Sequence, residues 1–372
     1  MRILHLADVH LDRPFVALPP DAAVARRGEL MAAFRRCLAA AHEQAVDLVT
    51  VGGDLWEEEH VMPDTRASVA YELGSVGLPV LLIAGNHDPL VPGGSYARTS
   101  WPGNVTVVDS SDPSRYEFGD IVVWALSWTG HPLSASFLDT FQVPDDGRRH
   151  LLLLHGTCQG AAWFADENGY CPFTPTQVEQ AGFAACLAGH LHAASWSDRV
   201  CYPGSLEPLD WSETGRHCYA LVDIEPDRVS VDLVDVNSRR YETRELGCDG
   251  AGSSAEVAAR LEELVRGLDG DGLCLRMRLT GQVAPDCSLD LRELEQRAAA
   301  LGPVVVVVED RTSPAYDLQA LASQRTVEGR FVAKLLAQLE QANDEREQQP
   351  IELALQLGLR AINGERELLH VD

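Results

Sequence analysis

Residues that could bind a metal or move a proton follow several short, mostly apolar runs in this sequence. The run at 81–84 ends in Gly85, Asn86, His87 and Asp88. The same layout recurs four times: residues 3–7 precede Asp8 and His10, residues 47–51 precede Asp54, residues 151–154 precede His155, and residues 186–188 precede His190 and His192. Such runs indicate buried strands, and loops at strand ends often carry functional side chains. We interpret the five strand ends as one site.

The residue types at these strand ends indicate a metal centre. Aspartate, histidine and asparagine suit Mn²⁺, Fe²⁺, Mg²⁺ or Zn²⁺. In an extended strand residues i and i+2 point the same way, so Asp8 and His10, or His190 and His192, can aim at one point. The set is too large for one ion, whereas two ions bridged by one carboxylate would use all of it. A two-metal clamp is suited to displacement at phosphorus.

Each motif alone has an ordinary explanation. An Asp-x-His pair is usually a solvated strand end, Gly-Gly-Asp is usually a turn, and His155 alone would be a hydrogen-bonded core histidine. Five such motifs in order, each ending an apolar run, favour the metal site.

Length and composition place limits on the molecule that carries the site. The 372 residues (40.5 kDa) predict one large domain with smaller appendages. No apolar stretch approaches the roughly 20 residues that span a bilayer, and the chain enters a strand at once, so we expect no membrane association and a cytoplasmic protein. The nine cysteines never form C-x-x-C, which favours reduced, buried thiols.

The net charge of −26 opposes general attraction to nucleic acid, because phosphate binding relies on Lys and Arg contacts. If DNA is the substrate, a local arginine patch or the metals must offset this charge. Lys334 is the only lysine, so nearly all positive charge is arginine.

The hydrophobic pattern predicts the elements that must position these residues. Helices are expected at 26–45, 65–76 and 175–182 among strand-like runs, and a turn-rich, polar stretch at 236–255 marks a domain boundary. Beyond it we expect an α/β module with helices at 255–267 and 290–301 and strands at 273–279 and 303–309. Helices at 326–342 and 350–363 follow, with Pro350 in the first turn of the second. The predicted domains are 1–240 (catalytic), 250–315 (small α/β capping domain) and 316–372 (helical hairpin and candidate partner-binding segment).

The strand-end motifs together resemble the motif set of the calcineurin-like metallophosphoesterases. The set comprises Asp8-Val9-His10, Gly53-Asp54, Gly85-Asn86-His87-Asp88, His155-Gly156 and Gly189-His190-Leu191-His192. The opening Asp8-Val9-His10-Leu11-Asp12, the later Tyr202-Pro203-Gly204-Ser205 and the module after residue 250 are similar to the SbcD-like DNA repair exonucleases.

This resemblance implies a fold and a role for each residue. The fold would be a four-layer α/β/β/α sandwich with a small α/β capping module and C-terminal helices. Two divalent ions would be bound, with Mn²⁺ expected and Fe²⁺, Mg²⁺ and Zn²⁺ as alternatives. The first metal would be held by Asp8, His10 and His192, the second by Asn86, His155 and His190, and Asp54 would bridge them. His87 would be catalytic and help the leaving oxygen depart, and Asp88 would orient its ring.

One position departs from the family pattern. Nucleases of this family carry a histidine three residues after the bridging aspartate, whereas this chain has Glu57. If the glutamate faces the substrate, it would repel a phosphodiester unless it binds a metal, pairs with an arginine such as Arg13, or is protonated. Alternatively, Glu57 turns outward with Glu58 and Glu59 as part of an acidic loop.

Three function classes remain open. The leading hypothesis is a two-metal phosphodiesterase that acts on DNA as a repair exonuclease, with endonuclease activity a further option, and that works with an SMC-like coiled-coil ATPase. A second is a phosphoesterase for nucleotides or other small phosphoesters, which the acidic composition and Glu57 favour. A third is a weakly catalytic scaffold subunit. A homodimer is retained as a further assembly.

Overall fold

The computed structural model describes residues 1–130, 136–159, 170–342 and 344–362. The chain divides into two compact units, Met1–Tyr241 and Glu242–Asp372. The site lies in the first unit.

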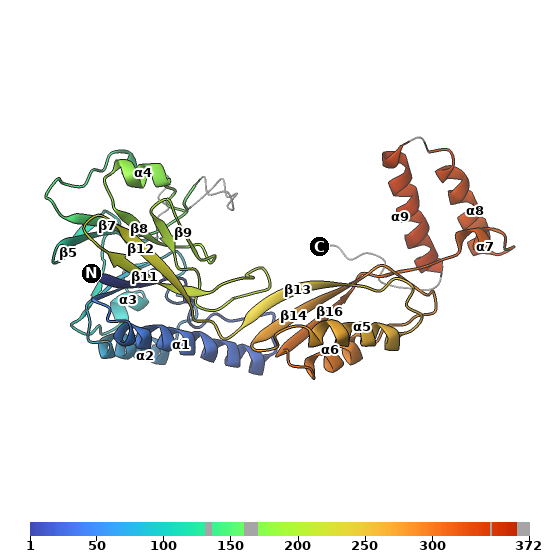
Figure 1. The fold of residues 1–372 in the computed structure, drawn as a ribbon, viewed down its shortest axis with the longest axis horizontal. Helices are drawn as coiled ribbons and strands as arrows, with labels where there is room; N and C mark the ends of the chain where they lie inside the picture. Colours follow the sequence, from blue (N-terminus) through green and yellow to red (C-terminus); the bar gives the residue numbers. More distant parts are fainter. Residues whose placement is uncertain (131–135, 160–169, 343, 363–372) are drawn as a thin grey trace. The chain divides into compact units, whose positions relative to one another are not determined.

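Two six-stranded sheets form the centre of the first unit (Figure 1). The first sheet contains β1 (Arg2–Leu6), β2 (Leu48–Gly52), β3 (Val80–Ile83), β4 (Val105–Val107), β11 (Cys218–Ile224) and β12 (Val229–Asp235), in the order β12-β11-β1-β2-β3-β4. The second contains β5 (Ser114–Phe118), β6 (Ile121–Ala125), β7 (Arg149–His155), β8 (Ala185–Gly189), β9 (Ser195–Ser197) and β10 (Val200–Tyr202), in the order β5-β6-β7-β8-β10-β9.

Alternation of side chains along the strands builds the layers, because neighbouring residues of a strand point to opposite faces. In β1, Ile3 joins the core between the two sheets, whereas Leu4 joins the core under the helices. In β7, Leu151 faces the core between the sheets and Leu152 faces the outer side. Each central strand is therefore buried on both faces, which explains its nearly continuous apolar sequence.

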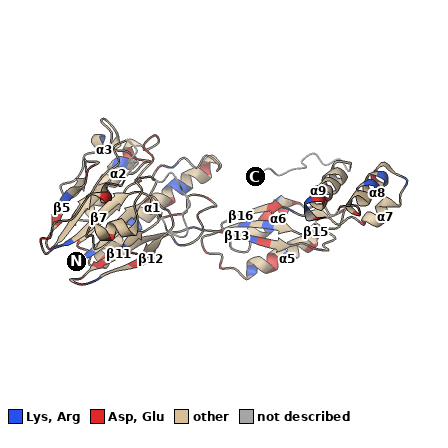
Figure 2. Cartoon of the chain, turned by 90° about the horizontal axis from the view of Figure 1, so that it is seen from above, with Lys and Arg blue, Asp and Glu red and all other residues tan. Residues whose placement is uncertain are grey.

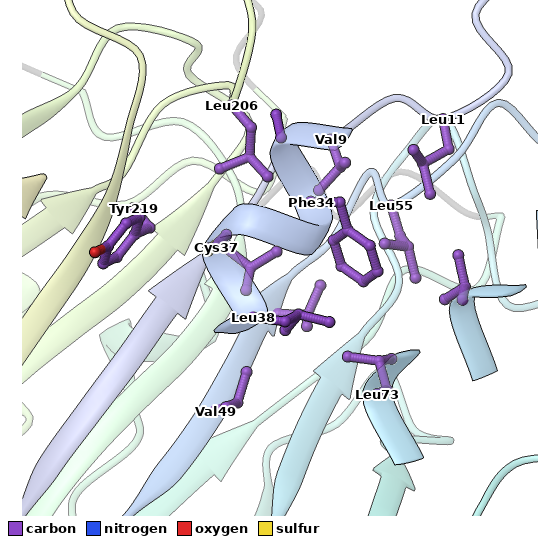
Figure 3. Close-up of a cluster of buried hydrophobic side chains, with 14 of the residues drawn as sticks. Val9, Leu11, Phe34, Cys37, Leu38, Val49, Leu55, Leu73, Leu206 and Tyr219 are labelled. Atoms are coloured by element: carbon purple, nitrogen blue, oxygen red, sulfur yellow. The ribbon is translucent and has the colours of Figure 1, made fainter. Parts of the chain in front are cut away.

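Helices cover the two outer faces. Helices α1 (Pro20–Glu43) and α2 (Pro63–Ser75) lie on the first sheet, where Phe34 of α1 packs among buried aliphatic side chains (Figure 3). On the opposite side of the unit, η1 (Phe137–Asp139) and α4 (Pro175–Gln180) cover the second sheet (Figure 1). The predicted four-layer α/β/β/α sandwich is confirmed. Two expected helices begin earlier than predicted, since a proline at the first helical position starts α1 and α2.

The strands that end at the site share one direction. β1, β2 and β3 are parallel neighbours, and so are β7 and β8. Across the sheets, the Nε2 atom of His5 in β1 lies 3.2 Å from the carbonyl oxygen of Ala188 in β8. The carboxyl ends of these strands consequently meet at one edge of the sandwich.

The second unit contains a small α/β module. Its sheet has the order β13-β14-β16, formed by β13 (Arg240–Gly247), β14 (Leu273–Thr280) and β16 (Val305–Asp310), and α5 (Ser254–Arg266) and α6 (Leu291–Ala299) share its core. Two short parallel strands, β15 (Gln282–Val283) and β17 (Ser313–Pro314), pair with each other after β14 and β16. β13 lies inside the stretch expected to be turn-rich, and only Tyr241 and Leu246 of this strand are buried. Because so few of its residues are buried, β13 lacks the apolar alternation from which a strand can be predicted.

The C-terminal helices are α7 (Leu318–Ala322), α8 (Val327–Leu339) and α9 (Glu345–Ile362). The expectation that Pro350 opens the last helix is wrong, because the helix begins at Glu345. There the carboxylate of Asp344 accepts a hydrogen bond from the Glu347 amide (3.0 Å), a cap that starts the helix before the proline. Val332, Leu355 and Leu359 form a small core between α8 and α9.

Two other general expectations can be compared with the structure. No helix in the described ranges is long and apolar enough to cross a membrane. All nine cysteines are free, and only Cys287 is not buried. The three-part domain division stays a prediction.

Candidate metal centre

The predicted ligands lie together where strands of the two sheets end. Three groups of side chains each place their ligand atoms within 4.8 Å of one another: Asp8, His10 and His192; His10, Asp54 and His87; and Asp8, Asp54 and His155. Asn86 joins them through its side-chain oxygen, and His190 through its ring. All seven predicted metal ligands therefore converge.

Four of these residues have left-handed backbone conformations, which non-glycine residues rarely adopt. φ is 51° at Asp8, 50° at His10, 52° at Asp54 and 105° at His190. Each such conformation costs roughly 1–3 kcal/mol and persists where the surroundings fix it. Here the Asp8 amide donates to the Gly53 carbonyl (3.1 Å), and the His10 amide to the Asp54 carbonyl (3.0 Å). The backbone therefore turns sharply after β1, β2 and β8, and these side chains point into the site.

Two glycines leave the space that these side chains need. A Cβ atom on Gly53, where φ is 93°, would lie 2.6 Å from Nδ1 of His155. A Cβ atom on Gly85 would overlap Oδ1 of Asp54. The glycines of Gly-Asp and Gly-Asn-His-Asp therefore allow the loops to approach one another.

One half of the centre is formed by Asp8, His10 and His192. The Nε2 atoms of the two histidines are 3.1 Å apart, and Oδ1 of Asp8 lies 4.0 Å from Nε2 of His192. Each imidazole has a carboxylate on its other nitrogen. Glu57 Oε1 lies 3.0 Å from Nδ1 of His10, and Glu213 Oε1 lies 2.7 Å from Nδ1 of His192. Carboxylates in this position fix the ring orientation of metal-binding histidines.

The other half is formed by Asn86, His155 and His190. Oδ1 of Asn86 lies 2.9 Å from Nε2 of His155 and 3.2 Å from Nδ1 of His190. The Nδ1 atom of His155 is 2.9 Å from the carbonyl oxygen of Gly52, so the backbone of β2 fixes this ring.

Asp54 lies between the two halves. Its Oδ2 atom is 3.3 Å from Nε2 of His155 and 3.7 Å from Nε2 of His10. Its Oδ1 atom accepts a hydrogen bond from the His87 amide (2.8 Å). One carboxylate thus reaches a histidine of each half.

Within the cluster, Asp54 and Glu213 favour the charged forms of His155 and His192, whereas burial lowers the pKa of His190 to about 4. Burial opposes a charged imidazole, but Asp54 outweighs it and raises the pKa of His155 to about 9. Burial is likewise outweighed at His192, where the Glu213 hydrogen bond raises the pKa to about 9. Burial opposes ionisation of Asp54 too, yet His155 holds the pKa of its carboxyl below the ordinary value. Imidazole nitrogens and oxygens around buried carboxylates are a donor set that fits divalent cations.

His87 differs from the other histidines in its exposure and its partner. Its side chain is 41% exposed, and Nδ1 lies 2.8 Å from Oε2 of Glu57. This hydrogen bond raises the pKa of His87 above its ordinary value. A partly exposed imidazole held by a carboxylate can donate a proton to a bound group.

The expectation that Asp88 orients the His87 ring is wrong. Asp88 is buried, and its carboxylate accepts hydrogen bonds from the backbone amides of Gly85, Asp54 and Leu55 and from the Tyr96 hydroxyl. Asp88 therefore ties two loops together. Among the described residues, the hydrogen-bond partner of the His87 ring is Glu57.

The two alternatives for Glu57 can now be separated. Its side chain is only 14% exposed and contacts His10 and His87, so the outward orientation is wrong. Arg13 Nη1 lies 3.3 Å from Oε1 of Glu57. The glutamate thus faces the site and pairs with the arginine that the sequence suggested.

Glu213 and Tyr170 contact the centre but were not predicted. Glu213 supports His192, and Ser205 and the Leu209 amide in turn hydrogen-bond Glu213. The Tyr170 ring stacks near His190 with 5.5 Å between centroids. Ser205 of the Tyr-Pro-Gly-Ser stretch was the one sequence signal near Glu213.

Comparison with known proteins agrees with this geometry. Residues 1–227, more than half of the chain, match the calcineurin-like phosphoesterase superfamily domain. The chain belongs to this superfamily. The resemblance inferred from the strand-end motifs is confirmed, membership supports a metal-dependent phosphoesterase, and the residue clusters indicate a dinuclear metal site.

Three relatives show which members of the superfamily are similar. An uncharacterised metallophosphoesterase of Bacillus subtilis, YhaO, is 27% identical over 307 residues, covering 78% of this chain and 74% of that protein. The DNA double-strand break repair protein Mre11 of Haloferax volcanii is 28% identical over 291 residues (76% and 62%). Mre11 of Methanopyrus kandleri is 25% identical over 288 residues (65% and 61%). The matches span less than two-thirds of either Mre11 protein.

Proposed function

We propose that this protein is a two-metal phosphodiesterase that cleaves DNA. The observation that carries the proposal is the position of Asp54, within 3.7 Å of a histidine in each half of the centre. A carboxylate shared by two ligand clusters suits a pair of ions, and a two-metal clamp suits displacement at phosphorus. Similarity to two proteins named for DNA double-strand break repair supports DNA as the substrate.

In this proposal the strand-end residues divide into two ligand sets. Asp8, His10 and His192 would hold one ion, Asn86, His155 and His190 would hold the other, and Asp54 would be a ligand of both. When bound, the ions would polarise the phosphoryl oxygens and activate water. Mn²⁺ is the proposed metal, with Fe²⁺, Mg²⁺ and Zn²⁺ as alternatives, because all four accept this mixture of ligands.

His87 acts on the leaving oxygen rather than as a ligand. Glu57 holds its Nδ1, which leaves Nε2 to donate a proton to the departing oxygen. Because Glu57 also contacts Nδ1 of His10, the same carboxylate orients a metal ligand and the acid.

A second candidate is hydrolysis of nucleotides or other small phosphoesters. The net charge of −26 favours it, since acidic side chains are interspersed with arginine in both units (Figure 2) and would oppose a polyanion. Activity on single- and double-stranded DNA, measured with Mn²⁺ beside a panel of nucleotides, separates the two. Hydrolysis of nucleotides without cleavage of either DNA would overturn the nuclease proposal. Cleavage from labelled ends or within circles distinguishes exonuclease from endonuclease activity.

We propose that an SMC-like coiled-coil ATPase binds to the C-terminal helices of this protein. Val327, Leu353 and Ile362 are 78%, 52% and 41% exposed, so apolar side chains remain on α8 and α9 although the helices bury Val332, Leu355 and Leu359 between them. Deleting residues 320–372 should remove co-purification of an SMC-like coiled-coil ATPase and leave hydrolysis of a small phosphodiester unchanged. An insoluble truncation would mean that the helices serve the fold.

A further inference from the structure

A pocket of about 370 Å³ in the first unit adjoins the metal centre. Glu57 lines it and is also the residue whose Oε1 lies 3.0 Å from Nδ1 of His10. Arg13 lines it too and lies 3.3 Å from the same carboxylate. Glu57 therefore contacts both the pocket and the ring of a proposed metal ligand. None of the metal-site roles assigned above uses this pocket.

The wall of the pocket is aromatic and aliphatic. Phe15, Leu209, Trp211 and Tyr241 contribute to it. Three of them are less than 9% exposed, and the Trp211 ring meets Tyr241 edge to face with 4.7 Å between centroids. The guanidinium of Arg26 lies over the Phe15 ring at 5.5 Å. Packing thus fixes these rings before any ligand arrives.

Size and chemistry restrict what the pocket can hold. Its volume is near the lower end of the range for small-molecule sites, about 300–1,000 Å³, so it has room for one planar group. At the polar edge, the carboxylate of Asp210 already accepts hydrogen bonds from the amide and hydroxyl of Ser212. A ligand held mainly by ring faces and aliphatic contacts is recognised by its shape and its π-face.

We propose that this pocket binds the nucleobase of the nucleotide that carries the scissile phosphate. The inference rests on the proposed phosphodiesterase function and deepens it. In a chain of net charge −26, affinity for a nucleotide gains from the uncharged base, because aromatic stacking does not depend on phosphate contacts. Since every base has a π-face, the pocket accepts all four bases. A base at a duplex end must unpair to enter, which favours single-stranded or frayed ends.

Two esters with the same leaving group test this proposal. Thymidine 5′-(p-nitrophenyl phosphate) carries a base, and methyl p-nitrophenyl phosphate does not. With Mn²⁺, Trp211→Ala should lower kcat/KM for the thymidine ester by about 5- to 150-fold, mainly through KM, and leave the methyl ester unchanged. Trp211→Phe, which keeps a ring, should retain most of the wild-type kcat/KM for the thymidine ester. Tyr71→Ala, at a 71% exposed position on α2, is the matched control and should change neither ester.

A second variant tests the pocket in case Trp211→Ala does not fold. Val16 lines the pocket but is 89% exposed, so Val16→Asp places a charge there without disturbing the core. It should lower the ratio of the two activities in the same direction. An equal fall on both esters, or an unchanged ratio in both variants, would overturn the base pocket.

Calorimetry separates failure of the pocket from failure of the proposed function. Protein loaded with Mn²⁺ is titrated with thymidine 5′-monophosphate and with 2-deoxyribose 5-phosphate. Tighter binding of the nucleotide, lost in Trp211→Ala and kept in Trp211→Phe, supports the pocket even if neither ester is hydrolysed. Equal affinity for the two phosphates, or no binding of the nucleotide, rejects the pocket even if both esters are cleaved. In that case the apolar wall serves another occupant, such as a side chain of a partner protein.

Discussion

The two halves of the metal centre support their histidines in different ways. In the half with His10 and His192, side-chain carboxylates of Glu57 and Glu213 lie behind the rings. In the other half, His155 is held by the backbone carbonyl of Gly52. A carboxylate makes an imidazole a more basic ligand, whereas a carbonyl mainly orients it. The first half therefore depends on replaceable side chains, whereas His155 of the second half depends on the backbone of β2.

The largest expected effect comes from the residue that both halves share. Asp54→Asn removes the charge between His10 and His155 but keeps an acceptor for the His87 amide. Because both ions would lose a ligand, turnover should be abolished and metal content should fall while the fold survives. Elemental analysis and circular dichroism of wild type and variant check this. Equal metal content with equal activity would remove Asp54 from the site.

The next largest effect concerns a residue that we assign to neither half. His87→Ala should lower kcat by roughly 10²–10⁴-fold, the range for a lost general acid, and leave the metal content unchanged. The residue lies close enough to His10 and Asp54 to be a ligand by geometry alone, so metal analysis decides between the roles. Loss of an ion from His87→Ala would show that it coordinates. His87→Gln, which retains a polar side chain, should lose activity in the same way.

Local sequence was sufficient to find the ligands but not their supports. The seven proposed ligands each follow or end a strand, so apolar run and polar terminus are adjacent in the chain. Glu213 supports His192 from a turn 21 residues away, with no periodic pattern to indicate it. Asp88 stands beside His87 in sequence, yet the fold gives it backbone amides as partners. The Glu57 carboxylate contacts His10, His87 and Arg13, which are 47, 30 and 44 residues distant in the chain.

Smaller effects should follow from changing what lies behind the rings. Glu213→Gln keeps an acceptor but removes the charge, and should lower metal affinity or activity by about 10–100-fold, as substitutions behind metal ligands do. Glu57→Gln should act similarly on His10 and should additionally reduce kcat through His87. Tyr170→Phe is the control on the other half: it keeps the ring near His190 and should change neither quantity. Metal titrations monitored by activity and by calorimetry measure these effects. An equal loss in Tyr170→Phe would contradict the difference between the halves.

The smallest effect on activity is expected from substitution of His5. This buried histidine lies in β1, and we do not assign it to a metal. Its ring lies 3.0 Å from Oγ1 of Thr50 and 3.2 Å from the Ala188 carbonyl, and no carboxylate of the described residues hydrogen-bonds it. Burial lowers its pKa to about 4, so between pH 6.5 and 4 the unfolded chain binds this proton and the folded chain does not.

Titration of His5 should therefore lower the free energy of unfolding as the pH falls. Stability is full above pH 6.5, falls by about 1.4 kcal/mol per pH unit below it, and levels near pH 4 after a loss of about 3 kcal/mol. His5→Gln cannot titrate, so its urea unfolding free energy should fall less between pH 7 and 4 by that amount, with activity at neutral pH unchanged. All seven tryptophans lie before residue 242, so their fluorescence reports on the first unit. Since every other titrating group is common to both proteins, parallel pH curves would mean that His5 is protonated in the folded state and that a carboxylate is not required to hold charge on a buried histidine here.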